Sequence, residues 1–286
     1  MHLLLVPSSA CPGDCVYCFG PHREGAVMTR ETLVATLEWG RTLADIDSLQ
    51  VTFHGGEPLV AGDDFYRMAL PLVHEWLTAP ALPQQSGPHR SPRQPLRLGI
   101  QSNLWLLSDE LAELFAAYGV RVGTSLDGPP AVNDRQRGTG SFGRTMTGIE
   151  RARAHGLRVG AICTVTSRSV EYADDIFDFF VSMALDFSVH PAVAPLGRPE
   201  ARCWTVKPEE YGRFLVHLFD RYVDERPDIH VGTFLSMAQS VSAGRGGICT
   251  FDDCLGSYLA VGPDGAIYPC QRFVGVAEYR LGHVTT

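Results

Sequence analysis

The sequence predicts an α/β fold built from parallel strands, on three observations. Short apolar segments with strand character recur along the chain, segments with helical periodicity lie between them, and polar motifs follow the strand ends. Strands that alternate with helices pair in parallel, because each helical crossover returns the chain to the same edge of the sheet. A length of 286 residues accommodates one α/β barrel or two ordinary domains, with enough chain to bury a hydrophobic core.

Six strands and six helices are predicted in alternation. The first helix has leucines at helical spacing after Thr29, a typical N-cap residue, and the fourth ends before Gly156, which suits the position after a helix. The segment from Thr78 to Pro95 holds five of the 19 prolines, so we expect a surface loop or a mobile insertion there. The predicted strands are His2–Val6, Leu49–His54, Leu96–Gln101, Arg121–Leu126, Leu157–Val165 and Phe187–Ala192. The predicted helices are Thr29–Ala44, Asp63–Leu77, Ser108–Tyr118, Ser141–His155, Val170–Ala184 and Pro208–Val223.

The composition excludes several classes of protein. With 45% hydrophobic and 20% charged residues, the chain is neither disordered, nor collagen-like, nor a small disulfide scaffold. Its 24 Lys and Arg against 32 Asp and Glu give a net charge of -8, which argues against broad nucleic-acid binding. The early apolar run Leu3–Val6 is far shorter than a bilayer helix of ~20 residues or a signal-peptide core. We therefore expect a cytoplasmic protein that binds neither nucleic acid nor a membrane.

Eight cysteines are unevenly distributed along the chain. Cys11, Cys15 and Cys18 lie within eight residues, three more lie near the C-terminus, and Cys163 and Cys203 stand alone. A disulfide framework fits poorly, because a chain with a full core does not need one and close neighbours rarely pair. Zinc is a second possibility, although the first group has no obvious fourth ligand nearby. Clustered cysteines in a reducing compartment are more often metal or redox ligands.

Four polar motifs follow four consecutive predicted strands. The cysteine group follows the first strand, Gly55–Pro58 the second, Ser102-Asn103 the third and Asp127-Gly128 the fourth. Active sites of α/β barrels and of open sheets lie at the carboxyl ends of their strands. We therefore expect these four loops to form one site.

These motifs resemble those of the radical S-adenosylmethionine enzymes. The resemblance rests on Cys11-x3-Cys15-x2-Cys18 with Tyr17 before the third cysteine, and on Gly-Gly-Glu-Pro after the second strand. The run Ser125–Pro129, followed by Asn133-Asp134, is similar to the subgroup that contains anaerobic sulfatase-maturating enzymes and SPASM-domain peptide maturases. This resemblance implies a partial (β/α)6 TIM barrel over residues 1–232 and the start of a SPASM domain over residues 233–286.

The resemblance also implies cofactors and the residues that bind them. Cys11, Cys15 and Cys18 would hold three irons of a 4Fe-4S cluster, and the fourth iron would bind S-adenosylmethionine. Its reductive cleavage gives a 5′-deoxyadenosyl radical, while the protein supplies position and excludes water. The expected cofactor-binding residues are Gly55, Gly56 and Glu57 at the methionine amino group, Ser102 and Asn103 at the ribose, and Ser125 and Arg137 at the ribose and carboxylate.

The C-terminal cysteines resemble the opening of a SPASM domain, which binds auxiliary iron–sulfur clusters. Cys254 and Cys270 match the family spacing, and Cys249 would be a third ligand of an auxiliary 4Fe-4S cluster. Pro263–Gly265 is a turn between two apolar segments, so we expect a β-hairpin that brings Cys254 and Cys270 together. The family pattern continues with further cysteines, and we expect the sequence given to be a piece of a longer protein.

The residue after Cys270 separates two possible functions. Sulfatase-maturating relatives carry a catalytic aspartate there, whereas this chain has Gln271, which cannot accept a proton at neutral pH. We therefore predict a maturase that cross-links a ribosomally made peptide through thioether or carbon–carbon bonds. The expected partners are a precursor peptide, a flavodoxin or ferredoxin electron donor, and a separate leader-binding protein. A sulfatase maturase and, less favoured, a structural metal-binding protein are the alternatives; no catalytic acid or base is assigned.

Overall fold

The described residues form one curved sheet whose first six strands are parallel. The computed structural model describes residues 2–20, 25–43, 50–78, 97–196, 198–244, 246 and 254–286. The strands are β1 (His2–Leu5), β2 (Gln50–Phe53), β3 (Arg97–Ser102), β4 (Arg121–Ser125), β5 (Val159–Val165), β6 (Phe187–Pro191), β7 (Tyr258–Val261), β8 (Ala266–Tyr268) and β9 (Gly282–His283). Their order in the sheet is β6-β5-β4-β3-β2-β1-β7-β8-β9. The predicted α/β barrel core of six parallel strands is confirmed.

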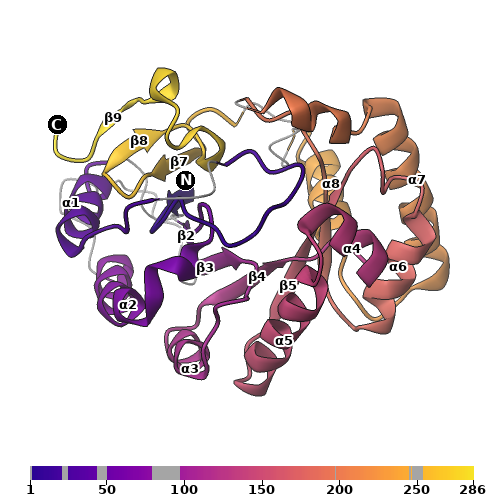
Figure 1. Cartoon of the computed structure of the whole chain (residues 1–286), viewed down its shortest axis with the longest axis horizontal. Helices are drawn as coiled ribbons and strands as arrows, with labels where there is room; N and C mark the ends of the chain where they lie inside the picture. The colour runs from indigo at the N-terminus through magenta and orange to yellow at the C-terminus, as the bar shows by residue number, and fades with distance from the viewer. Residues whose placement is uncertain are drawn as a thin grey trace.

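The helices of the described residues connect these strands in sequence. They are α1 (Arg30–Gly40), α2 (Gly62–Thr78), α3 (Asp109–Ala117), α4 (Pro130–Arg137), α5 (Ser141–Ala154), α6 (Ala173–Ser182), α7 (Pro208–Glu225) and α8 (Gly232–Ala243). Figure 1 shows α1, α2, α3 and α5 following one another along one side of the curved sheet. Thr29 caps α1 and Ser108 caps α3, each by accepting a backbone N–H bond. None of the described helices is long and apolar enough to cross a bilayer.

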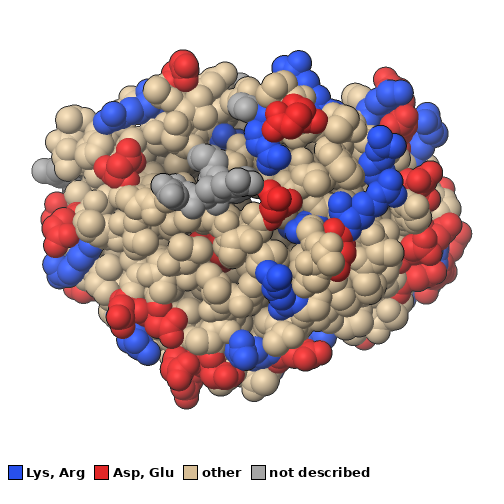
Figure 2. Space-filling model, in the orientation of Figure 1, with Lys and Arg blue, Asp and Glu red and all other residues tan. Residues whose placement is uncertain are grey.

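The two faces of the sheet have different environments. Along β5, Val159, Ala161, Cys163 and Val165 are buried, whereas the alternate residues are only partly covered. Successive side chains point to opposite faces of a strand, so one face packs under the helices and the other lines the interior of the partial barrel. Figure 2 shows charged side chains around the rim and over the right half of the viewed face, and a largely uncharged area left of the centre.

Aromatic packing secures the helix-covered face. The Phe53 ring on β2 meets Tyr66 of α2 edge to face at 5.3 Å, and Tyr66 meets Phe115 of α3 at the same separation. All three side chains are fully buried. Such edge-to-face contacts stabilise beyond the area they bury. They fix α2 and α3 against the strands whose following loops carry the predicted site.

Two helices differ from the predictions. The helices α4 and α8 are not predicted from the sequence, because neither has apolar residues at a clear helical period. The sequence of α4 is PAVNDRQR, and that of α8 is GTFLSMAQSVSA. The proline-rich segment predicted as a loop lies, beyond Thr78, outside the described residues. The C-terminal hairpin is confirmed, since β7 and β8 pair antiparallel, but β7 also pairs in parallel with β1 and so extends the barrel sheet.

Gly148 allows α5 to pack tightly against the loop after β3. A Cβ atom at Gly148 would lie 2.5 Å from the Cβ and carbonyl oxygen of Leu104, which is fully buried. Gly148→Ala should therefore destabilise the protein by ~1–3 kcal/mol through overpacking. Gly143→Ala, on the same helix with no atom within 4 Å of its added Cβ, should instead stabilise it by ~0.5–1 kcal/mol. Urea unfolding of both variants measures the difference, and equal effects would contradict the packing account.

Candidate active site

The loop after β1 carries three free cysteines at one end of the barrel. Cys11, Cys15 and Cys18 are partly exposed, and the Cys18 N–H donates to the Cys15 carbonyl at 3.1 Å, which makes a tight turn. Burial raises the pKa of Cys11 to about 12 and that of Cys15 to about 11, and the negative charges of the neighbouring thiolates contribute. The three thiols are therefore close enough to influence one another electrostatically.

The donor set of this loop suits a multi-iron cluster. In a 4Fe-4S cluster each cysteine binds a different iron, so the thiolates surround a volume instead of one point. Burial raises the pKa of Cys18, and the positive charges of Arg137 and Arg198 offset part of this rise and so favour the thiolate form that binds metal. These residues fit the cluster.

The predicted Gly-Gly-Glu motif binds the cysteine loop through its backbone. The Gly56 N–H donates to the Ser8 carbonyl at 3.2 Å, and the Glu57 N–H donates to the Ala10 carbonyl at 2.7 Å. A Cβ at Gly55, where φ is +134°, would lie 2.6 Å from Val6 Cγ1, and one at Gly56 would overlap the Ser9 and Ala10 carbonyl oxygens. The glycines are therefore required for the two loops to approach. Their predicted contact with S-adenosylmethionine stays a prediction.

Glu57 connects the loops that follow β2 and β3. Its Oε1 accepts from the Ser102 hydroxyl at 2.7 Å and from the Leu59 N–H at 3.0 Å, and its Oε2 accepts from the Asn103 N–H at 2.8 Å. The side chain is buried, and this burial raises its pKa to about 7 despite the three hydrogen bonds. Glu57 thus organises the two loops in addition to any contact with a ligand amine.

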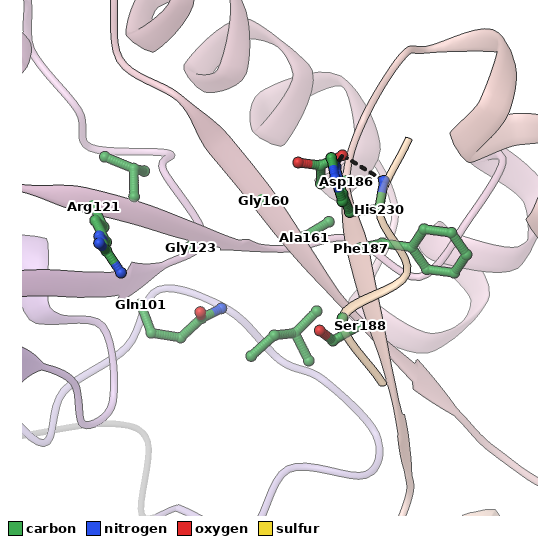
Figure 3. Close-up of a pocket in the computed structure, with 12 residues that line it drawn as sticks. Gln101, Arg121, Gly123, Gly160, Ala161, Asp186, Phe187, Ser188 and His230 are labelled. Carbon is green, nitrogen blue, oxygen red and sulfur yellow. Dashed lines mark hydrogen bonds and ion pairs between the residues drawn. The ribbon is translucent and has the colours of Figure 1, made fainter. Parts of the chain in front are cut away.

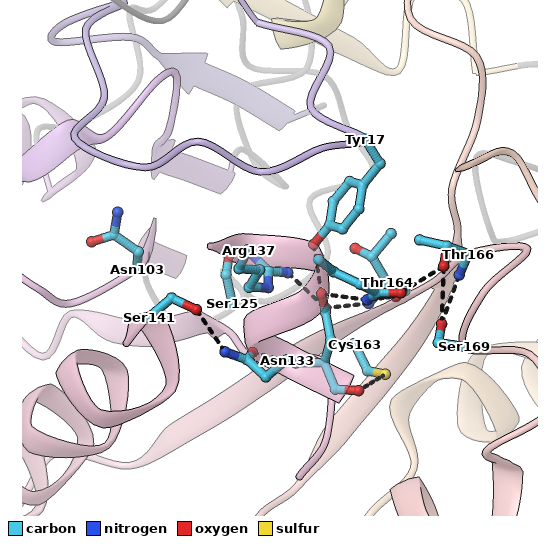
Figure 4. A network of polar contacts seen from close by, with 12 residues as sticks. Tyr17, Asn103, Ser125, Asn133, Arg137, Ser141, Cys163, Thr164, Thr166 and Ser169 are labelled. Carbon is cyan, nitrogen blue, oxygen red and sulfur yellow. Dashed lines mark hydrogen bonds and ion pairs between the residues drawn. The ribbon is translucent and has the colours of Figure 1, made fainter. Parts of the chain in front are cut away.

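The other residues predicted to bind S-adenosylmethionine differ in how many of their polar groups already form hydrogen bonds within the protein. Ser102 is buried and its hydroxyl also accepts from the Leu104 N–H at 2.8 Å, which leaves it little capacity for a ribose. Asn103 uses its Oδ1 to accept from the Trp105 N–H, and no partner of its Nδ2 amide is found among the described residues. Ser125 accepts from Gln101 Nε2 at 3.3 Å. Figure 4 shows Asn103, Ser125 and Arg137 on neighbouring segments, with Tyr17 above Arg137.

Arg137 has a partner inside the protein. Its NH2 group donates to Asp127 Oδ1 at 2.8 Å, and both side chains are buried. The buried Nε has no partner among the residues that the structure describes. Binding of a ligand carboxylate by Arg137 would therefore use nitrogens other than the one bonded to Asp127, and that role stays a prediction.

Asp127 lies at the site, as expected for the fourth polar motif, but two other contributors were not singled out from the sequence. Gln136 lies on the unpredicted helix α4, and Trp105 packs near Gly13 of the cysteine loop. A Cβ at Gly13 would lie 3.6 Å from the Trp105 ring, and Arg144 lies 4.9 Å above that ring. A large aromatic residue two positions after the Ser102-Asn103 motif is the signal that could have identified Trp105.

A cavity of about 390 Å³ opens inside the partial barrel at the amino-terminal ends of its strands. Gly123 of β4 pairs with Gln101 of β3 and with Gly160 of β5, and the Gln101 amide lies so close to Gly123 that an added Cβ would overlap its oxygen. Arg121, Asp186 and His230 lie around it, as Figure 3 shows. The cavity is thus at the opposite end of the strands from the cysteine loop.

The C-terminal cysteines lie at the same end of the β7–β8 hairpin. Cys254 precedes β7, and Cys270 follows β8 after Pro269. The Cys270 thiol donates to Gln271 Oε1 at 2.8 Å. Cys249 lies outside the described residues, so the auxiliary cluster stays a prediction.

The fold and this site define a family. Residues 5–180 match the model of the radical SAM superfamily, and the chain belongs to that superfamily. Membership confirms the predicted family, whose members carry a 4Fe-4S cluster and bind S-adenosylmethionine. The cysteine loop is the only segment of the described chain with the family's three-cysteine spacing.

Two relatives match most of the chain. The chain is 41% identical over 247 residues to an uncharacterised protein of Methanothermobacter thermautotrophicus, covering 86% of this chain and 88% of that protein. It is 26% identical to the serine-type anaerobic sulfatase-maturating enzyme of Bacteroides thetaiotaomicron, over 99% of this chain and 72% of the enzyme.

Solved structures have the same fold. Native anSMEcpe with bound AdoMet superposes with a TM-score of 0.82 at 22% identity, over 99% of this chain and 77% of that one. SuiB of Streptococcus suis bound to S-adenosylmethionine matches with a TM-score of 0.68 at 17% identity, over 100% of this chain and 63% of that one. These matches confirm the predicted partial-barrel fold.

Burial of Glu57 predicts a pH dependence of stability. Its pKa is raised from 4.5 to about 7 in the folded protein, so the native state loses stability as the pH rises through this interval. Above this interval the carboxyl is ionised in both the folded and the unfolded state, and stability falls no further. At ~1.4 kcal/mol per pKa unit the loss is about 3 kcal/mol. The free energy of unfolding of the wild type, relative to that of Glu57→Gln, should therefore fall by about this amount between about pH 4.5 and 8.

Urea unfolding of the metal-free chain at several pH values measures this difference. Burial lowers the pKa of His2 and His54 to about 4, so both histidines also add pH dependence, but they are present in both proteins and cancel in the comparison. Parallel stability curves for wild type and variant would contradict the inferred protonation of Glu57.

Proposed function

We propose that this protein modifies a ribosomally made peptide by radical chemistry and forms a thioether or carbon–carbon cross-link. The observation that carries the proposal is the three-thiol loop, which backbone hydrogen bonds from Gly56 and Glu57 hold at one end of a hollow barrel. The bound cofactors would supply a 5′-deoxyadenosyl radical that abstracts hydrogen from the substrate. The remaining work of the chain is to bind the peptide, orient it and exclude water.

Solved structures of related proteins support a peptide substrate. anSMEcpe is described with a bound Cp18Cys peptide, and SuiB with its precursor peptide SuiA. The cavity at the end of the barrel remote from the cysteine loop offers Arg121, Gln101 and Asp186 as polar groups.

Gln271 favours cross-linking over formylglycine formation. A glutamine amide neither takes up nor releases a proton at neutral pH, so Gln271 cannot act as a catalytic base. Its Oε1 accepts a hydrogen bond from the Cys270 thiol. The similarity to sulfatase-maturating enzymes keeps formylglycine formation as the second candidate function. The products formed from a peptide distinguish the two.

The proposal includes two partner proteins, an auxiliary cluster and a division of the chain into two domains. A flavodoxin or ferredoxin would supply the electron, a separate protein would bind the leader of the precursor peptide, and Cys249, Cys254 and Cys270 would hold an auxiliary cluster. Residues 1–232 would form the radical domain and residues 233–286 the start of the SPASM domain. A reducing compartment such as the cytoplasm suits the seven free cysteines of the described chain.

Removal of the three thiols tests whether the cysteine loop is needed for cleavage of S-adenosylmethionine. The triple variant Cys11→Ala, Cys15→Ala, Cys18→Ala should form no 5′-deoxyadenosine on anaerobic reduction, because no ligands of the first cluster remain. Cys203→Ala is the control, since that exposed thiol lies outside the cysteine loop and donates to the Glu200 carbonyl. Anaerobic wild type should be brown with roughly four irons at this site, and a colourless zinc protein would support the structural alternative instead.

Product analysis tests the subtype. Wild type incubated with a cysteine-containing precursor peptide should give a product lighter by two hydrogens, whose fragmentation locates a cross-link. Gln271→Asp should give the same cross-linked product, because an added base does not by itself redirect the peptide radical. Formylglycine from the wild type with intact clusters would overturn the cross-linking proposal and favour the sulfatase-maturase function. Mass spectrometry of the peptide measures both.

A further inference from the structure

Asp127, directly after β4, accepts four hydrogen bonds while fully buried. Its Oδ1 accepts from Arg137 NH2 and from the Thr164 N–H, each at 2.8 Å. Its Oδ2 accepts from the Tyr17 hydroxyl and from Gln136 Nε2, also at 2.8 Å each. Four donors satisfy the lone pairs of both oxygens, as a buried carboxylate requires.

These donors come from three separate parts of the chain. Tyr17 belongs to the cysteine loop, Gln136 and Arg137 to the last turn of α4, and Thr164 to β5. Figure 4 shows Tyr17, Arg137 and Thr164 close together in this network. A second link runs in parallel, because the Val16 N–H donates to the Gln136 carbonyl at 2.9 Å. The half of the cysteine loop that contains Cys15 and Cys18 is therefore fastened to α4 and β5.

The same contacts place a positive charge beside the cysteines. The Arg137 guanidinium carbon lies 5.5 Å from the centre of the Tyr17 ring, next to the loop. The Arg137 guanidinium forms a hydrogen bond with Cys15, and its positive charge acts on both Cys15 and Cys18. A buried guanidinium needs a fixed anion, and Asp127 is that anion.

We propose that Asp127 is a positioning residue of the cluster site, which holds Tyr17 and Arg137 against the cysteine loop and so fixes the charge beside Cys15. Asp127 does not touch the reacting groups; it acts through the two side chains that it orients. The inference rests on the assignment of the cluster to this loop and does not depend on which peptide is modified. Hydrogen bonds and charges around the sulfurs of a cluster set its reduction potential, so this arrangement also has an electrochemical consequence.

The first test removes one hydrogen bond only. Tyr17→Phe keeps the ring and loses the bond to Asp127, so amide exchange at residues 15–18 should accelerate about tenfold, the effect of one bond to a charged acceptor. The matched control is Tyr211→Phe, which loses a buried hydroxyl bond of 3.0 Å to the Val189 carbonyl on β6. Hydrogen exchange with mass spectrometry is measured on the full chain, with and without reconstituted cluster. Unchanged exchange in Tyr17→Phe, or equal acceleration in both variants, would overturn the positioning role.

The second test changes the charges. Asp127→Asn removes the anion and leaves the Arg137 charge unbalanced, so the midpoint potential of the first cluster should shift upward. Arg137→Gln removes the cation and should shift it downward. Anaerobic titration followed by electron paramagnetic resonance measures both shifts. Shifts of the same sign, or none in either variant, would refute the inference.

Each failure can be separated from a failure of the proposed function. If either charge variant does not fold or hold iron, the Tyr17→Phe comparison decides the question alone. If the wild type forms no 5′-deoxyadenosine but loop exchange still responds to Tyr17→Phe, the positioning role stands and the proposed radical function falls.

Discussion

Two buried carboxylates on either side of the cysteine loop hold the candidate active site together. Glu57 joins the loop after β2 to the loop after β3, and Asp127 joins the cysteine loop to α4 and β5. Their environments differ: neutral donors surround Glu57, and its pKa is raised to about 7, whereas Asp127 faces a guanidinium as well as neutral donors. A buried carboxylate without such donors would cost several kcal/mol, so each loop conformation and its carboxylate depend on one another.

Side chains alternate between the two faces of the parallel strands, and this alternation separates the packed core from the cavity inside the barrel. One face carries apolar residues that pack under the helices, such as Phe53 and Val165. The other face carries Gly123 and Gly160 at paired positions, and both line the cavity inside the barrel. Stability and ligand access are thus assigned to opposite faces of the same strands.

Much of the fold follows from local sequence patterns, but the connections within the site do not. The strands and most helices have apolar periods or caps that can be recognised along the chain, as with Thr29 and Ser108. The helix α4 lacks such a period, because its polar residues point to internal partners such as Asp127. The pair of Tyr17 and Asp127 is separated by 110 residues, and no local rule relates them. The sequence thus predicted the residue types at the site, while the partners of Arg137 required the structure.

The C-terminal hairpin is continuous with this site. β7 pairs with β1 in parallel, and the Val6 N–H donates to the Val261 carbonyl at 3.0 Å, so the hairpin lies beside the start of the cysteine loop. Arg272, two residues after Cys270, lies 5.5 Å from the centre of the Phe19 ring, which follows Cys18. Because a cation over an aromatic face is attracted to it, this contact joins the segment after Cys270 to the end of the cysteine loop. Any ligand held at Cys254 and Cys270 would therefore be structurally coupled to the cysteines that bind the first cluster.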